Sequence, residues 1–200
     1  MNFYSEDIIN NIIDNEEIEN IVDKLDIFKE TIKYLFQLFS FHNVHINYTQ
    51  NLLKDKRIQY AFYCIDFEFT IYNCPTMMMY RKYIDKENNE IKYYILLICT
   101  KFKFRNQGYA SKLLDGFIDR IKKEKIETEE KESKEPEEPE EPKEPKKIKI
   151  ILSSVEEAVL FYESRGFRWT RETLTDHKVL MNYEKYEEGK EYFILELCID

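Results

Sequence analysis

The sequence predicts a single mixed α/β domain over residues 1–200, and three observations support this fold class. Two hundred residues are room for about one domain. Hydrophobic residues make up 43% of the chain, which is enough material for a packed core. Helix-like periodicity near the N-terminus gives way to strand-like segments, which are followed by alternating helices and strands. We therefore expect a mixed sheet flanked by helices.

Residues 1–40 are predicted to form N-terminal helices. Isoleucines recur on one helical face from Ser5 onwards, and a second amphipathic stretch runs to Phe39 with apolar spacings near three and four. From His42 to Thr100 the composition shifts to β-branched and aromatic residues, which is typical of strands. Strands are predicted over 58–72, 76–84 and 91–100, and the loop KENNE joins the last two. The apolar run 93–100 indicates a central strand covered on both faces.

A helix, a strand and a second helix follow. The first helix is predicted from Gln107 or Gly108, because apolar residues recur at helical spacing as far as Ile121. A short strand is predicted over 148–152. A helix with a Ser-x-x-Glu capping box, on Ser153 or on Ser154, comes next, and Gly166 ends it. The final apolar segment, 191–199, is predicted to be an extra strand that extends the sheet or pairs with a partner, and the oligomeric state stays open.

An acidic insert is predicted over residues 127–147. It holds ten Glu and five Lys, so it carries −5 of the net charge of −9 and leaves −4 for the rest of the chain. Four of the five prolines lie in it, and it has almost nothing apolar to bury. We expect a disordered, solvated loop, with a docking tail for a basic partner as the alternative.

Composition also excludes several classes of protein. The acidic balance disfavours direct nucleic-acid binding, which needs clustered cations. No apolar stretch approaches the roughly 20 residues of a membrane-spanning helix. No signal peptide is evident, so we expect the protein inside the cell, in the cytoplasm or nucleus. The four cysteines include no CxxC pair, and with three histidines they predict reduced thiols and no metal site.

The polar turn 105–110, RNQGYA, lies at a strand-to-helix junction. Backbone N–H groups at a helix start lack partners within the helix, and they suit an anion such as pyrophosphate. Gly108 allows a ligand to approach the backbone closely. Taken alone, the turn is better explained as a plain helix start.

Two short patterns together resemble a known family. RNQGYA fits Arg/Gln-x-x-Gly-x-Gly/Ala, and Ala158, Tyr162, Gly166 and Phe167 fit Ala-x-x-x-Tyr followed by a Gly-Phe pair. In this order and on these elements, they resemble the acyl-CoA signatures of the GNAT superfamily of N-acetyltransferases. The resemblance covers about residues 90 to 185, interrupted by the insert. It implies a mostly antiparallel central sheet in which two central strands splay apart.

The resemblance also implies a cofactor, acetyl-CoA, and the residues that hold it. Backbone groups of Ile98, Cys99 and Thr100 would pair with pantetheine. The pyrophosphate would lie in the turn made by Arg105, Asn106, Gln107, Gly108, Tyr109, Ala110 and Ser111. Val155 replaces the family's asparagine near the second helix start, so that pantetheine contact is either missing or supplied by Ser153 or Ser154. Tyr162 matches the family's general acid, which protonates the departing thiolate; its alternative is a core aromatic.

The proton acceptor is less clear, because the family's carboxylate positions match Tyr94 and Ile150. Asp66 and Glu68 share one face of a predicted strand, so they are candidate bases. Their alternative is a solvent-facing surface. His42 and His45 are further candidates.

The sequence thus predicts an N-acyltransferase that moves an acetyl group from acetyl-CoA to a primary amine. The acceptor classes are a protein N-terminus, a lysine side chain and a small amine. The rival interpretation is an inactive or weakly active GNAT-like scaffold that docks partners through the acidic insert.

Overall fold

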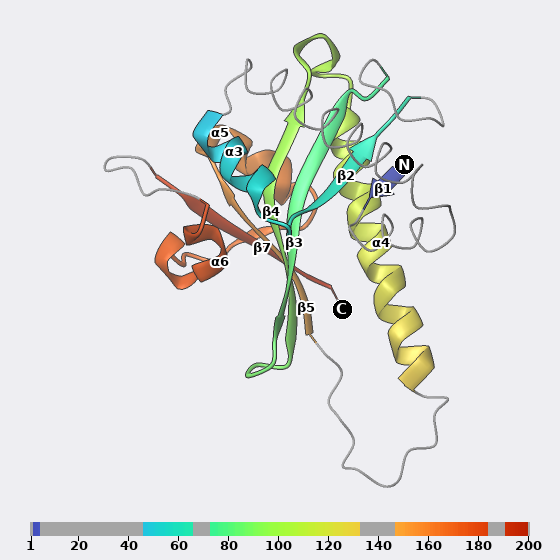
Figure 1. Cartoon of the computed structure of the whole chain (residues 1–200), viewed down its shortest axis with the longest axis vertical. Coiled ribbons are helices and arrows are strands. Elements are labelled where there is room, and N and C mark those ends of the chain that lie inside the picture. The colour runs from blue at the N-terminus through green and yellow to red at the C-terminus, as the bar shows by residue number, and fades with distance from the viewer. Residues whose placement is uncertain (1, 5–45, 66–72, 133–146, 184–190, 200) are drawn as a thin grey trace, which may run out of the picture.

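The computed structural model describes residues 2–4, 46–65, 73–132, 147–183 and 191–199, which build one seven-stranded sheet (Figure 1). The strand order is β1-β2-β3-β4-β5-β7-β6. The strands are β1 (Asn2–Tyr4), β2 (Gln59–Tyr63), β3 (Thr76–Asp85), β4 (Glu90–Thr100), β5 (Lys147–Ser154), β6 (Arg168–Trp169) and β7 (Phe193–Ile199). Neighbouring strands are antiparallel except β4 and β5, which are parallel. The predicted mixed, mostly antiparallel sheet is confirmed.

Helices cover both faces of this sheet. They are α3 (Ile46–Lys54), α4 (Tyr109–Glu132), α5 (Glu156–Glu163) and α6 (Lys178–Met181), with 3-10 turns η1 (Phe102–Phe104) and η2 (Leu174–Asp176). Figure 1 shows α4 along one side of the strands and α3 and α6 on the other. Among the described helices, none is both long and apolar enough to cross a membrane.

Two hydrophobic clusters hold the helices to the sheet. On the α4 face, α4 contributes Leu113, Leu114, Phe117, Ile118 and Ile121, which pack on strand residues such as Ile95, Ile150 and Leu152. On the other face, Leu52 of α3, Leu174 of η2 and Val179 and Leu180 of α6 pack on Tyr94, Leu96 and Ile151. The strand β4 thus contributes side chains to both clusters. This explains the continuous apolar run that marked it as a central strand.

Strand β4 carries a β-bulge at its middle. Met79 pairs with Leu97 and Tyr80 pairs with Ile95, so Leu96 is an extra residue in β4. The Leu96 carbonyl accepts a hydrogen bond from the Tyr48 hydroxyl of α3. A bulge bends its strand and frees backbone groups from the ladder.

Strands β4 and β5 separate next to this bulge. Their parallel pairing runs from Glu90 and Lys147 to Ile95 and Leu152, and both strands then continue unpaired with each other, to Thr100 and Ser154. The predicted splaying of two central strands is confirmed.

Several predicted boundaries differ from the structure. Residues 2–4, within the segment expected to be helical, form the edge strand β1, whereas the predicted helices over 5–40 lie outside the described residues. Residues 46–54, within the strand-like region, form helix α3. Strand β2 ends at Tyr63, well before the predicted end at residue 72.

The acidic insert is also shorter than predicted. Helix α4 continues to Glu132, so its last six residues come from the segment expected to be disordered, and Lys147 already belongs to β5. Residues 133–146 lie outside the described part of the chain. Segment 193–199 forms a strand as expected, and it lies inside the sheet between β5 and β6.

Candidate functional site

The turn between β4 and α4 has an unusual backbone. Asn106 and Gly108 both have positive φ angles, 60° and 77°. Helix α4 begins at Tyr109, directly after the predicted start, and its first backbone bond joins Lys112 N–H to the Gly108 carbonyl at 3.0 Å. The N–H groups of the first helical turn therefore have no carbonyl within the helix to bind. Left-handed residues in such a turn gather N–H groups into an anion-binding concavity.

Side chains hold this turn in place and surround it with positive charge. The Gln107 amide donates to the Lys103 carbonyl at 2.9 Å. The Tyr109 ring lies between Tyr63 and Phe104, with ring centroids 5.6 and 5.7 Å away. Lys103, Arg105 and Lys112 are exposed around the turn, and α4 has no acidic residue in its first turn. The turn thus has the backbone and the charge to bind a phosphate-like anion.

Backbone groups of β4 face the space where β5 has turned away. The Lys101 N–H donates to Pro75 at 2.9 Å, and the Cys99 carbonyl accepts from the Thr76 hydroxyl at 2.9 Å, so both residues face the β3 side. Because backbone groups alternate along a strand, those of Ile98 and Thr100 face the β5 side. Of the predicted trio Ile98, Cys99 and Thr100, the first and last thus have their backbone groups on the β5 side, and Cys99 has its own on the β3 side.

Tyr162 lies on α5 at a well-defined helix end. The Phe167 N–H donates to the Tyr162 carbonyl at 3.3 Å and the Gly166 N–H to Glu163 at 3.0 Å, which is a Schellman motif. Gly166 has a φ of 87°, which explains why glycine stands there. The predicted helix end is thus confirmed.

The Tyr162 side chain is half-buried on the α4 face. Its ring packs on Phe161 and Phe167, with centroids 5.0 and 5.7 Å away. Its hydroxyl forms no hydrogen bond with any described residue. Burial raises the pKa of Tyr162 to about 12, although the nearby positive charge of Arg165 acts to lower it. Arg165 bonds Asp115 of α4 at 3.0 Å, which fixes the end of α5 against α4. The hydroxyl is therefore a neutral donor available to a ligand.

The predicted capping box at α5 is wrong in both registers. The N-cap residue is Val155, and no side chain caps the helix. Ser153 and Ser154 belong to β5, where they pair with Ile194 and Phe193 of β7. The Ser154 hydroxyl donates to the Val155 carbonyl at 2.9 Å.

A histidine that the sequence did not single out lies on the opposite face of the sheet. His177, which is buried, packs edge-on against Tyr94 with centroids 6.0 Å apart. Its Nε2 bonds the Glu172 carboxylate at 2.9 Å. The turn η2 holds it there, because Asp176 accepts bonds from both the N–H and the hydroxyl of Thr173 at 2.8 Å. Tyr94 stands where the family's carboxylate was expected, so this cluster places an imidazole beside that position.

Of the remaining candidates for the proton acceptor, and of the positions matching the family's carboxylates, only Tyr94 and Ile150 lie in the described part of the chain. Asp66, Glu68, His42 and His45 lie outside the described residues. Ile150 is fully buried on the α4 face, away from the Tyr94 face. Within the described ranges, no group of three or more His, Cys, Asp or Glu side chains is arranged to hold a metal ion.

Comparison with known proteins gives a consistent fold. No protein-family model matches the sequence, and no curated protein matches it. Similar solved structures include Tetrahymena GCN5, 14% identical over 86% of this chain and 88% of that one, with a TM-score of 0.52. Another is Arabidopsis thaliana NAA60 in complex with acetyl-CoA, which is 13% identical over 85% of this chain and 94% of that one, with a TM-score of 0.53. A third is a Desulfovibrio desulfuricans protein described as an acetyltransferase of the GNAT family, which is 12% identical over 86% of this chain and 92% of that one, with a TM-score of 0.51. The chain therefore has the fold of the GNAT acetyltransferases, as its two motifs predicted.

Proposed function

We propose that this protein is an N-acyltransferase that transfers the acetyl group of acetyl-CoA to a primary amine. One observation carries the proposal: β4 and β5 part beyond Ile95 and Leu152, and β4 then leads through η1 into a cationic turn with two left-handed residues at the start of α4. An extended pantetheine arm needs free strand backbone, and a diphosphate needs converging N–H groups. This chain offers both at one end of one strand.

The cofactor would lie along β4. Ile98 and Thr100 have the backbone groups that face the β5 side, and of these the Thr100 carbonyl already accepts a bond from the Arg105 side chain at 3.4 Å. The turn from Arg105 to Ser111 would take the diphosphate. Gly108 suits this role, because a Cβ built there meets nothing within 4 Å and the space above the backbone is open. Ser154 is a weaker candidate contact, since its hydroxyl is already bonded to Val155.

Tyr162 is the proposed general acid. When the amine nitrogen attacks the thioester carbonyl, the carbon–sulfur bond breaks and sulfur leaves with its electron pair. The Tyr162 phenol then gives sulfur a proton. A pKa raised to about 12 keeps this phenol protonated at neutral pH. Contacts with Phe161 and Phe167 hold the half-buried ring in place, which supports the proposal that its hydroxyl is a positioned proton donor.

The acceptor amine would approach from the other face. The elements proposed to hold acetyl-CoA, α4 and α5, pack on one face of the sheet, so the face with α3 and α6 is left for the nucleophile. We add His177 as a candidate proton acceptor there, because Glu172 fixes its Nε2 and the described residues give its Nδ1 no hydrogen bond. Asp66 and Glu68 stay as predicted bases.

The acceptor class is proposed from the similar structures. One is the ribosomal-protein-S18-alanine N-acetyltransferase from Escherichia coli, 15% identical with a TM-score of 0.50. Another is a NatC complex bound to a Gag peptide and CoA, with a TM-score of 0.51. These two proteins support a protein or peptide amine ahead of a small polyamine.

Two measurements test the function in sequence. Acetyl-CoA titrated into the pure protein should give saturable heat, and the absence of binding would refute the proposal. CoA release is then followed with a panel of peptides with free N-termini, lysine peptides and polyamines. Turnover with any amine excludes the scaffold interpretation, whereas binding without turnover across the panel supports it.

A further inference from the structure

Two cysteine thiols meet between β2 and β3. Cys64 directly follows β2, and Cys74 comes two residues before β3. Tyr63 pairs with Thr76 and the Ile65 N–H donates to the Asn73 carbonyl at 2.8 Å, so Cys64 lies opposite Cys74 and Pro75 at a one-residue irregularity. The Cys64 and Cys74 side chains are hydrogen-bonded to each other there. Opposed residues of antiparallel strands have Cα atoms about 4.5–5.5 Å apart, and disulfides span roughly 4.4–6.8 Å. The two sulfurs therefore lie within bonding reach.

The two thiols differ in access and share a buried cation. Cys64 is half-buried, whereas Cys74 is fully buried and its Sγ donates to the Thr76 carbonyl at 3.3 Å. The Lys101 side chain is 8% exposed and interacts electrostatically with both sulfurs. A cation beside a thiol favours the thiolate, which is the nucleophilic form. At Cys74 the bond to Cys64 and burial outweigh this effect and raise the pKa of the thiol, which leaves the more accessible Cys64 as the better nucleophile. Cys64 is thus placed to react first and Cys74 to react second.

The other two cysteines lack this arrangement. Cys99 is buried in the hydrophobic cluster of the α3 face, and burial raises its pKa to about 12. Cys198 is exposed on β7, where its thiol bonds Glu196 at 3.3 Å. They serve as internal references, one buried and one exposed.

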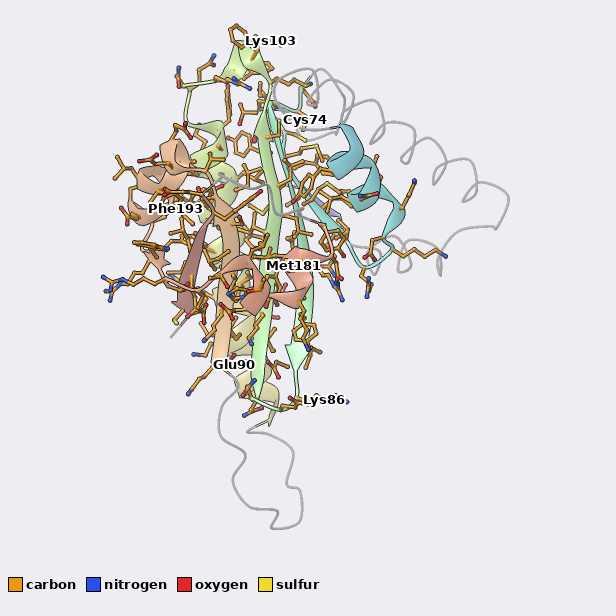
Figure 2. The ribbon with its side chains drawn as sticks, turned by 90° about the vertical axis from the view of Figure 1, so that its left-hand side faces the viewer. Cys74, Lys86, Glu90, Lys103, Met181 and Phe193 are labelled. Carbon is orange, nitrogen blue, oxygen red and sulfur yellow. The ribbon has the colours of Figure 1, made fainter. Side chains whose placement is uncertain are left out.

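The thiol pair lies at the end of the sheet from which η1 continues. Figure 2 shows Cys74 at the same end as Lys103 and opposite to Lys86 and Glu90. The residues after Cys74 bond the end of β4, through Pro75 to Lys101 and through Thr76 to Cys99. A covalent bond at Cys74 therefore adds a tie to the strand that leads into the α4 turn.

We propose that Cys64 and Cys74 form an oxidisable dithiol whose substrate is a peroxide. The Cys64 thiol reacts with hydrogen peroxide, which gives a sulfenic acid and one water. The Cys74 thiol then attacks that sulfur, a second water leaves, and the disulfide forms. Two thiols are oxidised by two electrons and one peroxide is reduced. A reducing dithiol reverses the reaction by exchange.

The experiment uses the reduced full chain and a small molar excess of hydrogen peroxide. After quenching and unfolding, we expect the free thiols to fall from four to two. The intact mass should fall by two hydrogens, and a non-reduced peptide map should show the Cys64–Cys74 link. Dithiothreitol should restore four thiols. Four remaining thiols, a link through Cys198, or a sulfinic acid at Cys64 without the link would overturn the proposal.

Variants separate the two steps. Cys74→Ser should leave a sulfenic acid at Cys64 that dimedone traps, and Cys64→Ser should abolish the link while Cys74 stays reduced. The matched control Cys198→Ser should form the link as the wild type does. Circular dichroism checks folding, and if a variant fails to fold, the wild-type map alone decides. No step uses acetyl-CoA, so failure here leaves the proposed acyltransferase function untouched.

Discussion

Substitution of Gly108 tests the proposed diphosphate turn most directly. Gly108 has a φ of 77° at the start of α4, and a Cβ there would point into open space. An alanine therefore meets no atom but takes on a strained backbone, at a cost of about 1–2 kcal/mol in the free energy of unfolding. Asparagine tolerates this region better and should cost less. The three variants Gly108→Ala, Gly108→Asn and Gly108→Glu thus separate strain from charge.

The effect of charge on binding can be worked out separately. A carboxylate at about 5 Å from one phosphate, at an effective dielectric constant of about 20, costs about 3 kcal/mol. The turn is exposed, so solvent and salt reduce this to about 2 kcal/mol, or about 30-fold in the Kd for acetyl-CoA. We expect Gly108→Glu to bind acetyl-CoA about 30-fold more weakly than Gly108→Ala does, while the two variants unfold at similar temperatures.

The assay is calorimetric titration with acetyl-CoA at low and high salt, with thermal unfolding of each variant. Screening should narrow the gap between Gly108→Glu and Gly108→Ala as salt rises. Equal Kd values for these two variants at low salt would refute the reasoning that a diphosphate lies over Gly108.

Four further variants probe the site and the core. Tyr162→Phe should lower turnover by about 100-fold and leave the acetyl-CoA Kd unchanged. Because the pKa of Tyr162 is about 12, loss of its proton should not lower wild-type activity below about pH 11. His177→Gln should lower kcat by about 100-fold at unchanged acetyl-CoA affinity, whereas unchanged turnover would remove it as a base. Phe117→Ala should lower the free energy of unfolding by about 3–5 kcal/mol in urea, since Phe117 is fully buried. Asp55→Asn should lower it by about 0.5–1.5 kcal/mol at pH 7. Its bonds to Arg57 hold the pKa of Asp55 well below its usual range, so this difference should begin to shrink as the pH falls below about 4 and should vanish only when the carboxyl of the folded protein is itself protonated.

The strands and turns that local patterns determine were predicted well. The apolar run of β4, the KENNE loop and the β7 segment each follow from residue type and periodicity. Gly108 was singled out because glycine lets a ligand approach the backbone, and Gly166 because glycine often ends a helix. The structure gives both residues a left-handed backbone, which glycine adopts without strain. These features depend on a few neighbouring residues, and the sequence contains that information.

Features that depend on distant contacts were missed. Helix α3 has weak helix formers such as Asn47 and Thr49, and its place is set by the packing of Leu52 on the sheet. The capping-box prediction was wrong because pairing with β7 extends β5 through Ser154, so both serines belong to the strand and do not cap the helix. His177 has no local signal, since its partner Tyr94 lies more than 80 residues earlier.

The place of β7 between β5 and β6 bears on the order of assembly. Strands β1 to β5 are neighbours in the order in which they are synthesised, so each can join the growing sheet as the ribosome releases it. Strand β6, only two residues long, has β7 as its described partner and must wait for it. Until residues 193–199 emerge, the outer edge of β5 stands open to other chains. The acidic segment made just before β5 supplies a high local charge during that interval, which opposes association between nascent chains.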